Sequence, residues 1–299
     1  MRDLMGYGPD GFNFYWPNNA KVAINFVINY EEGSELSPFN GDVSAETQGM
    51  DYPFASKVKG MRNLSAESFY EYGSRVGLWR LLRLFEQYQI PLTFFVTGQA
   101  LLLNPLFALY LAQNDHEIAG HGWRWIDYAR VPREVEKEHI VLCIETLNKL
   151  TGKKPKGWYT GRRSENTRDL LLEVGGFTYD SDSYADELPY YQAQHLIIPY
   201  SLDCNDFKFA TNSGFVSPQA FYEQLVASFK YLYEEKRPVI MTVGLHPRLS
   251  GKPARCQAIK QFLDYLLQYD DIWITQRINI ADYWLREFPV GKTIKRFGV

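Results

Sequence analysis

The 299-residue sequence is poor in cysteine and has no excess of either charge. Its three cysteines, Cys143, Cys204 and Cys256, are too few and too scattered for a disulfide framework or a zinc ribbon, so we expect reduced thiols. The 32 basic and 35 acidic side chains give a formal net charge of -3, and no basic block occurs along the chain. This balance argues against nucleic acid or an anionic membrane surface as the main partner.

Long hydrophobic runs are also missing from the sequence. The most apolar segment, residues 100–112, is interrupted by Asn104-Pro105 and is well short of the roughly 20 residues that span a bilayer. Residues 1–8 lack the apolar stretch of a secretory signal. We therefore expect a cytoplasmic protein with no membrane partner, for which an insoluble cell-wall polymer is an awkward substrate.

Aromatic residues, in contrast, are plentiful. The chain has 21 Tyr, 19 Phe and 7 Trp, and apolar residues make up 45% of it, which predicts a folded protein with a sizeable core. Apolar segments of strand length alternate with segments of helical period. We predict strands near residues 21–30, 91–97, 116–120, 157–159, 177–180, 195–199, 238–245 and 272–275, and helices near residues 65–85, 100–113, 132–152, 166–174, 218–236, 253–269 and 279–288.

This alternation predicts a mainly parallel sheet with helices outside it. We expect a single α/β domain that comprises residues 1–299. Seven or eight strands favour a distorted or incomplete (β/α) barrel and argue against an open doubly wound sheet. Residues 31–64, about 34 residues of polar chain with Gly and Pro, do not fit a compact unit. Loops longer than roughly 15 residues are usually lids, binding loops or disordered segments. We interpret this one as a lid or a subunit contact.

Polar side chains follow directly after several of the predicted strands, where the catalytic groups of a β/α barrel lie. Glu31 and Glu32 follow the first strand, and adjacent side chains at a strand end diverge, so that one can face the barrel mouth as a base. His246 follows the strand at 238–245 and suits a general acid near neutral pH. An exposed turn for the glutamates and a structural role for the histidine are the alternatives at this point.

Two further groups combine glycines, aromatic residues and arginines. In residues 120–128, His121 lies between two glycines, and in residues 157–163, Arg162 or Arg163 could bind a carbonyl-rich or anionic ligand. A packed aromatic corner, and pairing of an arginine with the acidic stretch near 180–187, are the alternatives. No serine or cysteine lies in a nucleophile elbow, so carboxylate, imidazole and guanidinium together predict hydrolysis of an acyl bond by activated water.

In chain order, these groups resemble the motifs of the polysaccharide deacetylase family (carbohydrate esterase 4) over about residues 20–285. That family has a distorted (β/α) barrel and a metal ion bound by one Asp and two His. A second Asp is its base and a late His its acid. The resemblance implies that Glu31 is at the base position, Glu32 and His121 are at metal-ligand positions, and His246 is at the acid position.

The chain departs from the family pattern at two positions. Trp125 stands where the second metal histidine is expected, and Tyr159 replaces the catalytic arginine of the third motif, with Arg162 three positions later. A catalytic zinc ion keeps three protein ligands and a water, and the indole nitrogen carries a proton and cannot ligate. We therefore expect no cofactor. If a metal is present, Glu32 and His121 are the candidate ligands.

These departures coincide with the allantoinase branch of the family, from bacterial purine catabolism. The segments at 2–8, 30–33, 70–75, 121–128, 157–162, 186–190 and 251–255 resemble that branch. The resemblance implies that a cytoplasmic homo-oligomer, with a tetramer as the expected size, opens the cyclic amide of allantoin to give allantoate.

In this interpretation, Glu31 deprotonates the attacking water, Glu32 and His121 fix the position of that water, and His246 protonates the departing ring nitrogen. The small, flat substrate would be bound by Arg162, Arg255, Trp123, Trp125, Tyr128 and Tyr159.

Two other functions stay open on the sequence alone. Metal-dependent N-deacetylation of a sugar or glycan needs a third ligand, which Asp182 or the loop at 31–64 would have to supply. The second open function is that of a non-catalytic barrel that binds a carbohydrate or a metabolite, although the presence of both Glu31 and His246 counts against it.

Overall fold

The computed structural model describes residues 3–8, 14–51, 59–235 and 237–291. Within them, nine strands form one sheet in the order β6-β7-β5-β4-β3-β2-β1-β8, and β9 also pairs with β1. Every neighbouring pair is parallel except β6 and β7. The strands are β1 Val22–Tyr30, β2 Thr93–Val96, β3 Glu117–Gly120, β4 Gly157–Trp158, β5 Tyr179–Asp180, β6 Tyr190–Gln192, β7 His195–Ile197, β8 Val239–Leu245 and β9 Ile272–Ile274.

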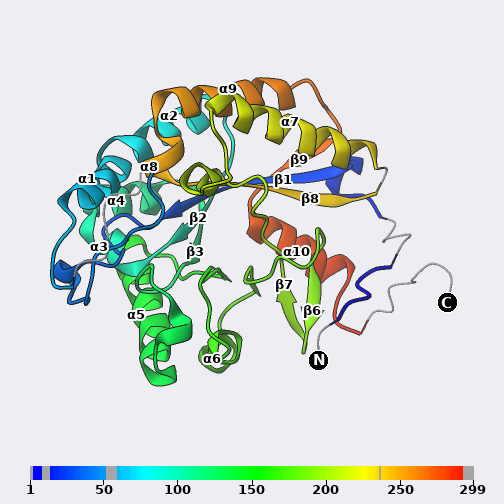
Figure 1. Cartoon of the computed structure of the whole chain (residues 1–299). Coiled ribbons are helices and arrows are strands. Elements are labelled where there is room, and N and C mark those ends of the chain that lie inside the picture. Colours follow the sequence, from blue (N-terminus) through cyan, green and yellow to red (C-terminus); the bar gives the residue numbers. More distant parts are fainter. Residues whose placement is uncertain (1–2, 9–13, 52–58, 236, 292–299) are drawn as a thin grey trace.

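The sheet curls without closing, because no pairing joins β6 to β8 in the part of the chain that the structure describes. The predicted distorted (β/α) barrel is therefore confirmed, in its incomplete form. In Figure 1, α7 and α9 run side by side along β1 and β8, and α5 and α6 lie farther round the curled sheet. Buried residues of all four helices belong to one core cluster with β1, so these helices cover the same, outer face of the sheet. The helices are α1 Leu64–Tyr72, α2 Leu78–Gln87, α3 Gly98–Leu103, α4 Pro105–Gln113, α5 Arg133–Thr151, α6 Thr167–Val174, α7 Pro218–Glu234, α8 Pro247–Ser250, α9 Pro253–Leu266 and α10 Arg277–Glu287.

Three local predictions need correction. The helix expected at 100–113 is two helices, because the Asn104 side chain accepts a hydrogen bond from the Phe107 N–H (3.1 Å) and Pro105 begins a new helix. The helix expected near 65–85 begins at Leu64, because the Asn63 side chain accepts a hydrogen bond from the Ala66 N–H (3.1 Å) and caps the helix there. Strand β6 was not predicted, since its three residues are partly exposed and lack an apolar pattern.

Strand β1 pairs with three other strands, β2, β8 and β9, and all nine of its residues are buried. A parallel strand covered on both faces reads as a near-continuous apolar run, which is why residues 21–30 were recognisable as a strand. Its two asparagines are paired inside the protein: Asn25 donates to the Thr242 hydroxyl (3.0 Å), and Asn29 donates to the Tyr200 hydroxyl (3.0 Å).

A buried guanidinium from α10 fills part of the barrel interior. Arg277 is fully buried and donates to Asn25 Oδ1 (3.0 Å), to the Ser181 hydroxyl (2.9 Å) and to the Ile198 carbonyl (2.6 Å). Burial lowers the pKa of Arg277. Polar groups inside the barrel, including Asn25 of β1 and Thr242 of β8, are thus satisfied by one cation from α10.

Among the described residues, no helix combines the length and the apolar character needed to cross a membrane. Cys143, Cys204 and Cys256 are all buried and none forms a disulfide, as the sequence predicted.

Two glycines hold the short helix α8 against the turn between α1 and α2. That turn, Gly73–Gly77, is π-helical. A Cβ on Gly77 would lie 2.0 Å from the Pro247 carbonyl oxygen, and a Cβ on Gly251 would lie 2.2 Å from the Gly77 Cα. The two backbones therefore pack directly on each other, and this contact fixes the start of α8 just beyond β8.

We predict that Gly77→Ala lowers the free energy of unfolding by about 1–3 kcal/mol, the usual cost of overpacking. The added methyl group meets backbone atoms, which cannot move aside as a side chain can. Thermal denaturation followed by circular dichroism measures the change. Val76→Ala, which alters a partly exposed side chain in the same turn, is the control and should change stability far less. Equal stability of the two variants would contradict this prediction.

Candidate active site

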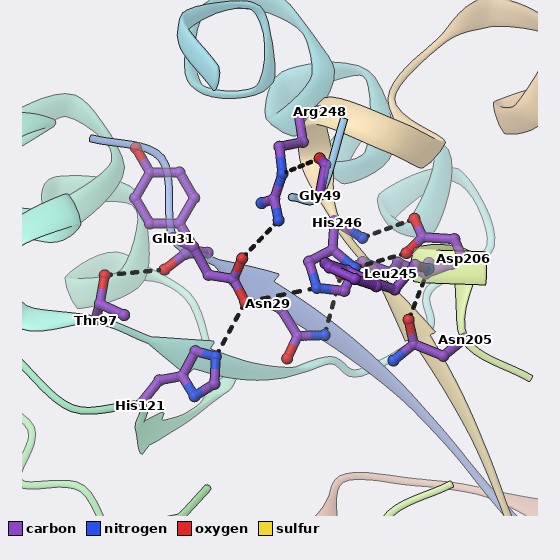
Figure 2. A network of polar contacts seen from close by, with 12 residues as sticks. Asn29, Glu31, Gly49, Thr97, His121, Asn205, Asp206, Leu245, His246 and Arg248 are labelled. Atoms are coloured by element: carbon purple, nitrogen blue, oxygen red, sulfur yellow. Dashed lines mark hydrogen bonds and ion pairs between the residues drawn. The ribbon is translucent and has the colours of Figure 1, made fainter. Parts of the chain in front are cut away.

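Three polar residues predicted from strand ends meet at the carboxyl edge of the sheet. Glu31 follows β1, His121 follows β3 and His246 follows β8. Because these strands are parallel and belong to one sheet, their carboxyl ends point to the same edge. Figure 2 shows the two imidazole rings turned toward the Glu31 carboxylate from different strands.

The Glu31 carboxylate is the centre of this group. Its Oε1 atom lies 3.1 Å from His121 Nε2 and 3.5 Å from His246 Nε2. Its Oε2 atom accepts a hydrogen bond from Arg248 Nη2 at 2.7 Å. Burial by itself would raise the pKa of Glu31, but the charges of Arg248 and His246 and hydrogen bonds from both imidazoles hold that pKa well below its usual range. Glu31 is therefore ionised at neutral pH.

His246 is held by a second carboxylate, from Asp206. The His246 Nδ1–H donates to Asp206 Oδ1 (2.6 Å), and its backbone N–H donates to Asp206 Oδ2 (2.8 Å). Burial by itself would lower the pKa of His246, but the charges of Glu31 and Asp206 raise it to about 9. At neutral pH, His246 is thus a charged imidazolium that can give its Nε2 proton to a group near Glu31.

His121 is oriented by the third strand end. Its Nδ1–H donates to the backbone carbonyl of Tyr159, which leaves Nε2 directed at Glu31. The Tyr159 ring stacks on the imidazole, with the ring centroids 5.3 Å apart and the planes 9° from parallel. Tyr159 therefore lies directly against His121 and sets the direction of its imidazole.

Glu32 points away from His121. Its Oε2 atom accepts the backbone N–H of Glu31 (3.0 Å), and its Oε1 atom accepts the backbone N–H of Arg248 (3.3 Å). A Cβ on Gly73 would lie 2.5 Å from the same Oε1, so the glycine of the π turn makes room for this carboxylate. Adjacent side chains at the strand end do diverge as expected. Glu32 was expected to fix the position of the water together with His121, and the structure places Glu31, and not Glu32, beside that imidazole.

The two arginines expected at the substrate bind the chain's own long loop. Arg162 donates to the Gln48 side-chain oxygen (3.0 Å) and lies 3.7 Å above the Trp125 ring. Arg255 donates to Asp51 (2.6 Å). The described part of the loop at 31–64 thus lies against the barrel and is fastened there by guanidinium groups.

The other aromatic residues of the predicted pocket have different places. Trp125 is buried with Tyr70 and Phe207 in a small apolar cluster beside the site. Trp123 packs on α3, where a Cβ on Gly98 would lie 2.6 Å from its indole. Tyr128 is only 2% exposed and its hydroxyl donates to the Arg124 carbonyl (3.3 Å), so it supports the loop that follows β3 and does not wall a pocket.

A groove of about 1490 Å³ opens on the far side of Tyr159. Tyr184 and Tyr200 both line it. The Tyr184 hydroxyl is 2.8 Å from the Tyr159 hydroxyl, and the Tyr200 ring lies 4.6 Å from the Tyr159 ring. The Tyr159 ring therefore separates this groove from His121.

The residues present do not fit the metal ion that the family resemblance implies. Trp125, at the position of the second histidine, has no lone pair to offer, and its ring contacts the Arg162 and Arg248 guanidinium groups. Glu32 bonds to backbone N–H groups, and His121 Nε2 faces Glu31. Within the described residues, no three His, Cys, Asp or Glu side chains are placed to hold a metal ion. We therefore derive no catalytic step through a metal.

Two residues of the site were not singled out from the sequence. Arg248 is fully buried against Glu31, although the sequence showed it only as part of a Pro-Arg turn after His246. Asp206 lies in a 3-10 turn, Asp206–Ala210, within a segment that carried no strand or motif signal. Its role depends on the isolated bridge between Asn205 and Gly244, which brings this segment alongside β8.

We predict that Asp206→Asn lowers the pKa of His246 from about 9, because the amide removes one of the two negative charges that raise it. NMR titration of the imidazole measures the shift, with half-buried His139 as an internal reference that should not move. Because the pKa of His246 is raised above its ordinary value of about 6.5, protonation of His246 stabilises the fold fully below about pH 6.5. This stabilisation is lost as the pH rises through about 9. The variant should therefore lose this dependence at alkaline pH. An unchanged His246 titration would contradict the prediction.

The chain is similar in sequence and in fold to several known proteins. A sequence model of the family described as polysaccharide deacetylase matches residues 65–177. A Schizosaccharomyces pombe protein named for the polysaccharide deacetylases is 37% identical, and the match covers 92% of this chain and 93% of that protein. A crystal structure of a Pseudomonas aeruginosa PAO1 protein, also named for that family, is 43% identical, with a TM-score of 0.92 and coverage of 96% of this chain and 99% of that one.

A second crystal structure, of PuuE allantoinase, is also 43% identical, with a TM-score of 0.93 and coverage of 96% of this chain and 98% of that one. This chain therefore belongs to the polysaccharide deacetylase family of hydrolases.

Proposed function

We propose that this hydrolase opens the five-membered ring of allantoin to give allantoate, by general acid and base catalysis without a metal ion. The observation that carries the proposal is the position of Glu31, a buried and ionised carboxylate facing two imidazoles, one of which is kept protonated by the charges of Glu31 and Asp206. The likeness to PuuE allantoinase over nearly the whole of both chains supports this substrate.

The chemistry assigns one role to each group. Glu31 Oε1 takes a proton from water, and the water oxygen attacks the ring carbonyl carbon. As the bond from that carbon to the ring nitrogen breaks, His246 Nε2 gives its proton to the departing nitrogen. The proton on Glu31 then passes to His246, and the proton of the new carboxylic acid is released to solvent, so that both residues return to their starting states. His121, held by the Tyr159 carbonyl, positions the water beside Glu31.

The charge of the site suits a neutral ligand. Arg248 and His246 are balanced by Glu31 and Asp206, each within hydrogen-bonding distance of its partner, and burial raises the pKa of Glu32, the further carboxylate beside Arg248. A cyclic ureide brings amide N–H and carbonyl groups without a net charge of its own in the ring, so it does not upset this balance. The expected homo-oligomer, with a tetramer as its size, and the cytoplasmic location are part of the same proposal.

The second candidate is N-deacetylation of a sugar by a metal-dependent mechanism, because two of the related proteins are named for polysaccharide deacetylation. That mechanism needs a third ligand. Asp182, the sequence candidate for it, accepts the backbone N–H groups of Thr160 (2.9 Å) and Gly161 (2.8 Å) and so holds the loop after β4.

The first experiment compares allantoin hydrolysis by the purified protein with and without EDTA, alongside a measurement of bound zinc and cobalt. We expect turnover that the chelator does not reduce. Stoichiometric metal together with loss of activity in EDTA would establish the deacetylase mechanism instead. The mass in solution, set against 34.7 kDa for one chain, tests the oligomer.

We predict that Glu31→Gln and His246→Ala each reduce kcat for allantoin by roughly 10²–10⁴-fold, the usual contribution of a general base or acid. Glu71→Gln is the matched control, because that glutamate is exposed on α1, and its activity should equal that of the unaltered protein. Activity of Glu31→Gln within a few-fold of the control would exclude Glu31 as the base.

A further inference from the structure

Arg248 is the fully buried cation of the candidate site, and it bonds to two distant parts of the chain. It lies in α8, directly after β8, and has no solvent-exposed surface. Its Nη2 donates to Glu31 Oε2 (2.7 Å), and its Nε donates to the backbone carbonyl of Gly49 (2.8 Å). Figure 2 shows the guanidinium between the carboxylate and the loop, on the opposite side of Glu31 from His121.

The hydrogen bond from Arg248 gives the two carboxylate oxygens of Glu31 different partners. Oε2 accepts the hydrogen bond from Arg248, whereas Oε1 is the atom near both imidazoles. A general base needs one oxygen with a lone pair directed at the reacting water. Because the guanidinium holds Oε2, the carboxylate cannot rotate about its final bond without losing a charge-assisted hydrogen bond. Oε1 is thereby kept on the reactive side.

The guanidinium itself has little freedom. Its central carbon lies 4.4 Å from the Tyr70 ring centroid and 5.2 Å from that of Trp125. Its Nη1 atom has no hydrogen-bond partner among the described residues and is 3.5 Å from Glu32 Oε1. Two aromatic faces and a second carboxylate therefore surround the cation, and its position depends on the backbone of α8 and on Gly49.

This arginine comes from a different part of the chain than the family pattern suggests. At position 159, where the resemblance expects the catalytic arginine, the chain has a tyrosine stacked on His121. The guanidinium on Glu31 arrives instead from the opposite flank, at the start of α8.

We propose that Arg248 is a positioning residue for the base: together with the Gly49 carbonyl, it holds Glu31 so that Oε1 faces the water. The inference rests on the proposed function for its kinetic test but not for its structural test. It gives the loop segment at 46–51 a role in the reaction, since this segment supplies the carbonyl that fixes Arg248.

Gly49 offers a way to disturb Arg248 without altering any polar side chain of the site. A Cβ on Gly49 would lie 2.8 Å from Arg248 Nη2 and 3.1 Å from the Tyr70 hydroxyl. Gly49 also has a φ of +71°, a region in which other residues are strained. Gly41, in the same loop, has a φ of +87° and nothing within 4 Å of an added Cβ. Gly49→Ala and Gly41→Ala thus carry a similar backbone strain, but only the first meets Arg248.

The kinetic test measures kcat and KM for allantoin in Arg248→Lys, Arg248→Met, Gly49→Ala and Gly41→Ala. Misplacing a catalytic group by about 1 Å can cost roughly 100-fold in rate. We expect kcat of Arg248→Met and Gly49→Ala to fall by at least that factor with KM changed less than about threefold. Arg248→Lys should keep part of the activity, because an ammonium can bond Glu31 but cannot also reach Gly49 in the same geometry. Gly41→Ala should retain its kcat.

If Arg248 had only a structural role, the kinetic constants and stabilities of these variants would differ from those expected above. In that case, Gly49→Ala and Gly41→Ala would lose stability and activity in parallel, and kcat per folded molecule would be unchanged in both. Thermal denaturation of each variant, measured beside its kcat, separates the two cases. A folded Arg248→Met or Gly49→Ala variant with kcat within twofold of the unaltered protein overturns the proposal.

The structural test uses no substrate. In a crystal structure of Gly49→Ala or Arg248→Met, we expect the Glu31 carboxylate to have left its position beside His121 and His246. A carboxylate that stays in place overturns the positioning role. If the unaltered protein fails to hydrolyse allantoin, the proposed function falls, whereas the orientation of Glu31 in these crystals still decides the role of Arg248.

Discussion

The ion pair between Glu31 and Arg248 is the interaction on which the rest of the site depends. Both side chains are almost completely buried, so neither charge could remain there alone. Removing one partner of such a pair typically costs about 3–5 kcal/mol, because the other charge is left without compensation. The pair therefore joins three parts of the chain that are far apart in sequence: the end of β1, the start of α8 and the loop at Gly49.

Much of the site was predictable from the sequence, and the reason is topological. Glu31, His121 and His246 each follow an apolar run, and parallel strands place their carboxyl ends at one edge, so alternation alone predicted that these residues meet. The direction of a side chain was not predictable in the same way. Which of Glu31 and Glu32 faces His121 depends on the twist at the end of β1 and on the space beside Gly73.

Residues outside the strand ends carried no such signal. Asp206 reaches His246 only because an isolated bridge brings an irregular segment alongside β8. Arg248 reaches Glu31 because the glycine contact with the π turn sets the position of α8. Both depend on backbone packing between distant segments, which neither hydrophobic period nor local motif encodes.

The partners of the arginines near the barrel mouth were also not predictable from the sequence. Arg162 and Arg255 read as ligands for a substrate, because a guanidinium at a strand end or helix start suits carbonyl and carboxylate groups. In the structure, Arg162 bonds to Gln48 and Arg255 bonds to Asp51, both within the chain itself. Arg124 does the same with Asp42 (2.9 Å). A long polar loop beside the barrel was visible in the sequence, but its partners depended on its path.

The stacking of Trp125 has a spectroscopic consequence. Its indole has one guanidinium at 3.7 Å and another at 5.2 Å, supplied by Arg162 and Arg248. A nearby positive charge alters the energy of the excited indole, so the emission of this side chain carries information about both cations. Because both arginines are also tied to Gln48 or Gly49, the fluorescence of Trp125 is a built-in optical probe of whether the loop is seated on the barrel.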